Sequence, residues 1–186
     1  MTITSIINDQ TIISWPATTL SQAIHSKEVT CRQVMQAYLR RIDEINPQVN
    51  AIVARQPTDV LLAQADQCDS ELATGTTTNS HGQQQHGHSR GPLHGVPIAI
   101  KDLAAVRGMV TTSGSLLLRD YIPQEDAAFV ARIRNAGAII IGHTNTPEFG
   151  LGSHTYNAVY GRTRNAFDHS LSSGGSSGGA AVALQL

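Results

Sequence analysis

Aromatic residues and net charge are both scarce in this sequence of 186 residues. Aromatic side chains make up 4% of it, and 13 Lys and Arg residues almost balance 14 Asp and Glu residues, for a net charge of −1. There is no basic patch that would favour a nucleic acid, and no polybasic segment that would favour a membrane surface. We therefore expect neither nucleic acid nor membrane as a partner.

Cysteine is rare as well. Cys31 and Cys68 lie far apart in the sequence and form no Cys-x-x-Cys pair, so free thiols in a reducing compartment are expected. No apolar run approaches the length of a membrane span. The N-terminus has neither the basic nor the apolar region of a signal peptide. These absences predict a cytoplasmic protein.

The residues that are present suffice for a domain with a sizeable core, because 40% of the chain is hydrophobic and its length allows substantial burial. Residues 1–17 are expected to form an N-terminal arm. Three helical patterns follow, at 18–26, 31–46 and 58–72. In the second, Thr30 and Gln33 form a capping-box pattern, and the pair Asn46-Pro47 predicts the end of the helix.

A polar segment at residues 74–91 differs from the rest of the chain. Residues 75–90 contain no apolar side chain, so the segment cannot bury enough surface to offset the entropy of ordering, and we expect a flexible insertion. His81, His86 and His88 suggest an alternative, a metal-responsive or interaction protein. No Cys or acidic residue lies nearby, however, and the spacing matches no closed zinc site. We therefore expect no metal and no cofactor.

Two apolar segments, 96–100 and 138–142, are typical of buried strands. Residues 125–135 between them have a helical pattern, with Phe129, Val130 and Ile133 expected to face inward. The order strand, helix, strand predicts an α/β sheet.

Lys101 directly follows the first strand. It either reaches solvent or pairs with Asp102, or burial lowers the pKa of its amine until it can act as a base. The strand alone leaves both alternatives open.

A Gly/Ser segment at 170–179 is followed by an apolar run at 180–186. Such a segment buries few side chains and can bring backbone N–H groups close to a ligand. The apolar run predicts a helix, whose N-terminus would favour negative charge. A non-catalytic module that binds a small molecule or an anion is therefore one interpretation of this segment.

Three segments taken together resemble the amidase signature family of serine hydrolases: 95–102, 142–149 and 174–179. The resemblance covers residues 18–186 apart from the polar insertion. It implies hydrolysis of carboxamide C–N bonds by a Ser–Ser–Lys triad. It also implies an α/β fold with a mixed sheet flanked by helices and a helical N-terminal region.

The resemblance assigns the triad lysine to Lys101 and the bridging serine to Ser176. It implies a cis peptide bond before that serine. It further places four residues in the loop that faces substrate and oxyanion: Gly174, Gly175, Ser177 and Gly178. The sequence departs from the family at three positions, with Ala166 and Ser173 where proline is usual and His143 where lysine is common.

The triad nucleophile has no counterpart here, since in the family it lies in a downstream Gly-Gly-Ser segment that this sequence does not reach. Ser173 and Ser177 are poor substitutes, because the second serine of the doublet is not the family's nucleophile. We therefore expect an incomplete amidase-signature fold, a single partial domain over 1–186, without useful turnover by itself. A small-molecule amide would be its substrate once a downstream segment completes it. Self-association, or pairing with the missing C-terminal half, is expected from apolar surface left bare.

Overall fold

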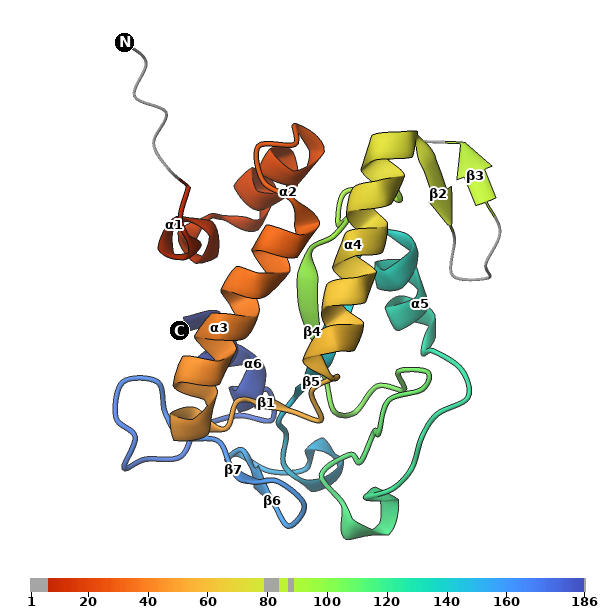
Figure 1. The fold of residues 1–186 in the computed structure, drawn as a ribbon. Coiled ribbons are helices and arrows are strands. Elements are labelled where there is room, and N and C mark those ends of the chain that lie inside the picture. The colour runs from red at the N-terminus through yellow and green to blue at the C-terminus, as the bar shows by residue number, and fades with distance from the viewer. Residues whose placement is uncertain (1–6, 79–83, 87–88, 186) are drawn as a thin grey trace. The chain divides into compact units, whose positions relative to one another are not determined.

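The computed structural model describes residues 7–78, 84–86 and 89–185 (Figure 1). Its contacts divide the chain into two compact units. The first comprises Met1–Arg40, Thr58–Pro97 and Ile133–Ile139, and the second comprises Arg41–Pro57, Ile98–Arg132 and Ile140–Leu186.

The first unit is mainly helical. It holds α1 (Asp9–Ser14), α2 (Ala17–His25), the N-terminal half of α3 (Cys31–Val49) and α4 (Thr58–Thr74). The predicted capping box at the start of α3 is confirmed, since Thr30 N–H donates to Gln33 Oε1 (2.9 Å) and Gln33 N–H donates to Thr30 Oγ1 (3.0 Å). The buried faces of these helices supply the apolar core of the unit, which includes Leu20, Ile24, Val34, Met35, Leu61 and Ala65.

The C-terminal end of α3 lies beyond the predicted stop at Asn46-Pro47. The helix contains Pro47 and ends at Val49, because the reversal comes one turn later at Asn50, whose φ is +54°. The Asn46 side chain supports this turn, since its Oδ1 accepts from the N–H groups of Ala51 (2.9 Å) and Ile52 (2.8 Å). Asn46 therefore acts as a cap for the segment after the helix and not as its terminator.

Within the polar insertion, the structure describes two short antiparallel strands, β2 (Thr76–Thr78) and β3 (Gln84–His86), paired from Thr76↔His86 to Thr78↔Gln84. The pair follows directly on the C-terminal end of α4 (Figure 1). His81 and His88 lie outside the described residues. The flexibility predicted for this segment stays a prediction.

A three-stranded sheet carries the residues of interest, in the order β1 (Ile52–Val53), β5 (Ile139–Thr144), β4 (Pro97–Lys101). β1 runs antiparallel to β5. β4 runs parallel to β5. Ile139 N–H donates to Val96 O at the start of the two strands, and Asp102 N–H donates to Thr144 O at their end, so the residue numbers of both partners increase in the same direction. All six residues of β5 are buried. The predicted α/β class with a mixed sheet is thus confirmed.

The helix between β4 and β5 is shorter than predicted. α5 spans Ala128–Asn135 instead of 125–135. The inward orientation predicted for Phe129 is wrong, since its side chain is 50% exposed. The same prediction for Val130 is confirmed, because Val130 is the buried residue of the helix. Gly137, with a φ of +100°, allows the sharp turn into β5 that an L-residue would resist.

The second unit is completed by short elements and one terminal helix. These are the 3-10 helices η1 (Leu116–Leu118) and η2 (Glu148–Gly150), the antiparallel strands β6 (Tyr156–Asn157) and β7 (Gly161–Arg162), and α6 (Gly178–Gln185). Large apolar side chains are exposed in this unit, among them Leu117, Leu151, Phe167 and Leu184. No helix among the described residues is long and apolar enough to cross a membrane.

Candidate active site

Lys101 and Ser176, which are 75 residues apart in the sequence, meet in the second unit. Lys101 Nζ lies 2.8 Å from Ser176 Oγ and 2.9 Å from Ser177 Oγ. Lys101 is the last residue of β4, and the two serines immediately precede α6. The end of a buried strand and the start of a helix therefore bring one amine into contact with two hydroxyl groups.

The protonation of Lys101 depends on its surroundings. Its side chain is half-buried, and this burial lowers the pKa of the amine from its ordinary value. Asp102 is not its partner. The Asp102 carboxylate is fully buried and accepts from Thr112 N–H (2.9 Å), Thr112 Oγ1–H (2.5 Å) and Gly114 N–H (3.3 Å). Of the two alternatives left open for Lys101, the geometry favours an amine aimed at hydroxyls.

The loop that carries Ser176 is held by threonines that the sequence did not single out. Thr146 Oγ1–H donates to Ser176 O (3.1 Å), and Thr155 Oγ1–H donates to Gly175 O (2.8 Å). Gly175 has a φ of +71° and its N–H donates to Ser153 O (2.7 Å). The only available signal was position, since Thr146 follows the buried strand β5, where sites form in α/β folds.

Among the glycines of the loop, Gly178 is buried against protein, whereas Gly174 and Gly175 are exposed. Gly178 N–H donates to Thr155 Oγ1 (3.1 Å), and a Cβ at Gly178 would lie 2.3 Å from that oxygen. Gly175 N–H is likewise engaged with Ser153 O. Two N–H groups that an anion-binding module would present are thus already occupied. The assignment of Gly174, Gly175, Ser177 and Gly178 to an oxyanion loop stays a prediction.

The peptide bond between Gly175 and Ser176 is trans, which corrects the expectation of a cis bond at this position. For a non-proline residue the trans form is favoured by ~3–4 kcal/mol. The contact between Lys101 and Ser176 therefore forms here without a cis bond.

Two of the departures from the family pattern have structural explanations. Ser173 N–H donates to Thr163 O (2.8 Å), a hydrogen bond that a proline at this position could not make. Ala166 packs against a small apolar cluster formed by Val49, Ala51 and Val182. Neither change removes a group that contacts Lys101.

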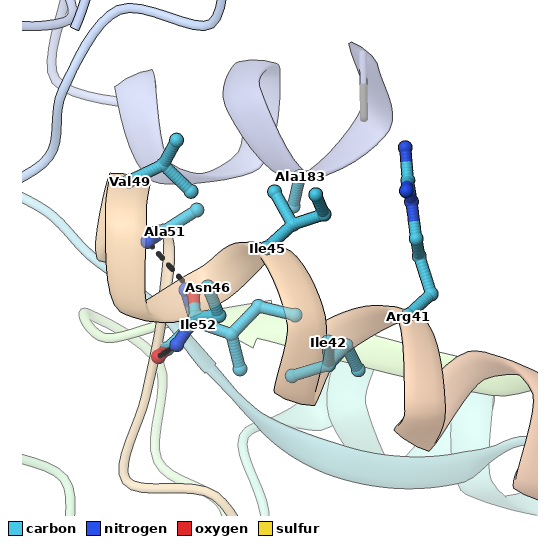
Figure 2. Close-up of a pocket in the computed structure, with 8 residues that line it drawn as sticks. All are labelled: Arg41, Ile42, Ile45, Asn46, Val49, Ala51, Ile52 and Ala183. Atoms are coloured by element: carbon cyan, nitrogen blue, oxygen red, sulfur yellow. Dashed lines mark hydrogen bonds between the residues drawn. The ribbon is translucent and has the colours of Figure 1, made fainter.

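A shallow apolar pocket lies elsewhere in the second unit, where α3 approaches α6 (Figure 2). Its volume is about 50 Å³, which has room for a few water molecules at most. It is lined by Arg41, Ile42, Ile45, Asn46, Val49, Ala51, Ile52 and Ala183. Figure 2 shows these residues and the hydrogen bond from Ala51 N–H to Asn46 Oδ1 (2.9 Å). The pocket contains no site residue and is too small for an amide substrate.

The first unit contains a buried group of metal-ligand residue types, Cys68, Glu71 and His94, whose donor atoms lie within 4.8 Å of one another. The imidazole nitrogens of His94 and the carboxylate of Glu71 already have protein partners. His94 Nδ1 accepts from Arg90 N–H (3.1 Å), and its Nε2–H donates to Cys68 O (3.0 Å). Glu71 forms a two-point ion pair with Arg90 (2.6 and 2.7 Å). With both imidazole nitrogens engaged and a guanidinium beside the carboxylate, the group does not fit a metal.

Comparison with known proteins identifies the family that these features belong to. The model of the amidase family matches residues 33–185. The chain belongs to the amidase family. The matched region includes Lys101, the buried strand β5 and the Ser176 loop.

Individual relatives give the same result. The A subunit of glutamyl-tRNA(Gln) amidotransferase from Acidothermus cellulolyticus is 41% identical over 93% of this chain and 32% of the relative. An acylamidase from Rhodococcus erythropolis is 38% identical over 90% of this chain and 32% of the relative. Among solved structures, the native peptide amidase of Stenotrophomonas maltophilia superimposes with a TM-score of 0.78 at 33% identity, over 91% of this chain and 34% of the other. The chain thus spans about a third of the length of the relatives it matches.

Proposed function

We propose that this chain provides the lysine and bridging-serine part of an amidase site, which hydrolyses a carboxamide C–N bond when a further segment supplies the attacking hydroxyl. The contact between Lys101 Nζ and Ser176 Oγ at 2.8 Å is the observation that carries the proposal. A base that reaches a nucleophile through an intervening hydroxyl must lie within hydrogen-bond distance of that hydroxyl, and this pair does.

The proton path follows from the chemistry of an amide. In the first step, the attacking hydroxyl passes its proton to Ser176 Oγ while Ser176 passes its own proton to the neutral Lys101 amine, and the oxygen adds to the carbonyl carbon. The same path in reverse delivers the proton to the nitrogen, so that the C–N bond breaks and a neutral amine or ammonia leaves. Water then hydrolyses the acyl intermediate. The lowered pKa of Lys101 supports this role, because a neutral amine is needed at neutral pH.

The attacking hydroxyl belongs, in this proposal, to the part of the relatives that lies outside the matched region. This chain covers 32% of the amidotransferase A subunit and of the acylamidase, so two-thirds of each relative has no counterpart here. Part of the anion-stabilising set would come from that region too, and the loss of one such donor alone lowers the rate ~10²–10³-fold. We therefore propose no useful turnover for residues 1–186 alone.

The substrate that we propose is a carboxamide of small-molecule size. We also propose that the protein acts in the cytoplasm. The relatives carry names that refer to different amides, such as a peptide amidase and a fatty acid amide hydrolase. What they share is the C–N bond that is cleaved. We propose no cofactor for this reaction, because every proton transfer uses side-chain groups. The partner that we propose is a polypeptide that contains the missing segment.

Complementation tests this function. The chain is mixed with a separately produced polypeptide corresponding to the unmatched two-thirds of the Stenotrophomonas peptide amidase. Ammonia release from a peptide amide and labelling by a fluorophosphonate are then measured for each part and for the mixture. We expect release and labelling in the mixture alone, with the label on the added polypeptide.

The matched variants are Lys101→Met and Ser176→Ala, each in the mixture. Removal of a general base lowers rates ~10²–10⁴-fold, and we expect both variants to fall in that range while co-purification with the added polypeptide persists. Turnover that survives both variants would contradict the proposed roles. Labelling of the chain by itself would contradict the absence of a nucleophile.

A further inference from the structure

The backbone of Lys101 is fixed on both sides by fully buried polar groups. On the N-terminal side, Ile100 O lies 3.0 Å from His143 Nδ1. On the C-terminal side, Asp102 N–H donates to Thr144 O (3.1 Å), and the Asp102 carboxylate binds the turn at Thr112. Buried polar groups are costly unless paired, so such a concentration around one lysine calls for an explanation.

The hydrogen-bond partners determine the state of His143. A carbonyl oxygen can only accept, so Nδ1 must carry the hydrogen that Ile100 O receives. Thr111 Oγ1 lies 3.2 Å from Nε2, and Nε2 shares the single hydrogen of this hydroxyl with Met109 O, which lies 3.3 Å away. Burial lowers the pKa of His143 despite the opposing effect of Asp102. The contact with Ile100 O therefore places a hydrogen on Nδ1, and burial favours the neutral form of the imidazole.

The groups around His143 leave no direct path to the serines. The nearest ionisable group is Asp102, whose Oδ1 is 4.0 Å from His143 Nε2. Burial, and then the charge of Asp102, raise the pKa of the Tyr160 phenol, which is hydrogen-bonded to the Thr112 side chain. His143 is on β5 and contacts the main chain of β4, so any influence on Ser176 must pass through the placement of Lys101.

We infer that His143 and Asp102 are positioning residues that hold the end of β4 so that the Lys101 amine stays on Ser176 Oγ and partly shielded from water. Ile100 is held through its carbonyl oxygen, and Asp102 is held through its N–H and its carboxylate. The main chain on each side of Lys101 is therefore fixed, and this fixes the direction in which the lysine side chain leaves it. Because effective catalysis tolerates misplacement of only about 1 Å, loss of either anchor would release the amine. The inference rests on the proposed function only for the use of that amine.

The sequence offers an unusually clean experiment. Lys27 and Lys101 are the only lysines in the chain, and Lys27 is exposed in the first unit. Trace acetic anhydride is applied to the full chain across a pH series, and acetylation of each lysine is read by peptide mass spectrometry. Lys27 serves as the internal reference for reagent loss. The readout is the pH of half-maximal acetylation of Lys101, which a general loss of stability would not move selectively.

Three variants distinguish a role in positioning the Lys101 amine from a general role in stability. His143→Leu removes the Nδ1 donor, whereas His143→Asn keeps an N–H near the Nδ1 position. For His143→Leu we expect the half-acetylation pH of Lys101 to rise toward the ordinary lysine value of ~10.4. For His143→Asn we expect it to stay close to wild type, and Asp102→Asn is expected to raise it in the same direction as His143→Leu. The Lys27 profile should not change in any variant.

An unchanged Lys101 profile in a folded His143→Leu chain would overturn the inference. If that variant does not fold, ¹⁵N NMR of the wild-type imidazole decides independently, because the structure requires the neutral tautomer with its hydrogen on Nδ1. A hydrogen on Nε2 instead would also overturn it. Neither measurement uses amide hydrolysis, so failure here and failure of the complementation experiment are distinguishable.

Discussion

Gly179 is the position where α6 approaches the sheet most closely, and it gives the sharpest test of how the site is assembled. A Cβ added there would lie 2.4 Å from Asn145 N, 2.6 Å from Asn145 O and 2.9 Å from Ala51 O. These three atoms are backbone, and Asn145 N–H donates to Ala51 O (2.9 Å). Gly179 therefore covers the hydrogen bond that joins the ends of β1 and β5, with no flexible side chain in between to give way.

The expected change in the free energy of unfolding for Gly179→Ala combines one stabilising and two destabilising contributions. Alanine favours the helix by ~0.8–1.0 kcal/mol over glycine. Against this, α6 must move by roughly 1 Å to restore ordinary contact, and overpacking of this kind costs ~1–3 kcal/mol. If the Asn145–Ala51 hydrogen bond opens and leaves its groups buried, a further ~1–3 kcal/mol is lost. We therefore expect a net loss of about 2–4 kcal/mol.

Urea unfolding followed by circular dichroism measures this loss, and hydrogen exchange of α6 locates it. Gly174→Ala is the matched control, because the nearest atom to its added Cβ is Ser153 O at 3.8 Å, and we expect a change within ~0.5 kcal/mol. Ser176 lies three residues before Gly179, so displacement of α6 should also raise the half-acetylation pH of Lys101. A Gly179→Ala chain that unfolds at the wild-type urea concentration would refute the reasoning.

Three further predictions concern buried charge. Glu71→Gln leaves the Arg90 guanidinium, whose side chain is 19% exposed, without its carboxylate, and should lower the free energy of unfolding by about 3 kcal/mol; an additional Arg90→Gln should recover part of this in urea unfolding. Burial lowers the pKa of His94 and His143, so below pH ~6.5 the unfolded chain binds more protons than the folded chain. The free energy of unfolding, measured with urea, should therefore fall between pH 7 and pH 5 by up to ~1.4 kcal/mol per histidine per pH unit. Equal free energies of unfolding at both pH values would contradict this. Lys101→Met removes a partly buried amine and should change the free energy of unfolding by less than ~1 kcal/mol. A larger change in urea unfolding curves at pH 7 would contradict this.

Sequence reasoning located what depends on short-range chemistry. The capping box at Thr30 and Gln33 formed as predicted, because both partners lie within one helical turn. Lys101 and Ser176 were singled out by resemblance, and the structure places Lys101 Nζ 2.8 Å from Ser176 Oγ. Their roles in catalysis stay predictions. The reach of α3 was misjudged, because Pro47 is tolerated in its last turn and the end of the helix is set by the Asn50 turn.

What the sequence could not reveal depends on contacts between distant segments. Thr155 holds the Gly175 carbonyl and the Gly178 N–H together, yet a lone threonine in a polar loop has no local signature. Phe129 was predicted to be inward from helical periodicity, but α5 is only eight residues long and its packing is decided by Val130. Hydrogen-bond partners of loop residues follow from the tertiary structure and not from spacing.

In the proposed function, the base and the attacking group of the amidase site come from different segments, and the contacts of Lys101 and Ser176 bear on this division. Lys101 is fixed by β4 and β5, and Ser176 by Thr146 and the start of α6. All of these contacts lie within the second unit, so the amine and the hydroxyl are oriented before any nucleophile is present. Because Lys101 is only half-buried, a segment covering it would lower the pKa of its amine further. Contact with that segment would then activate the base and supply its target in one step.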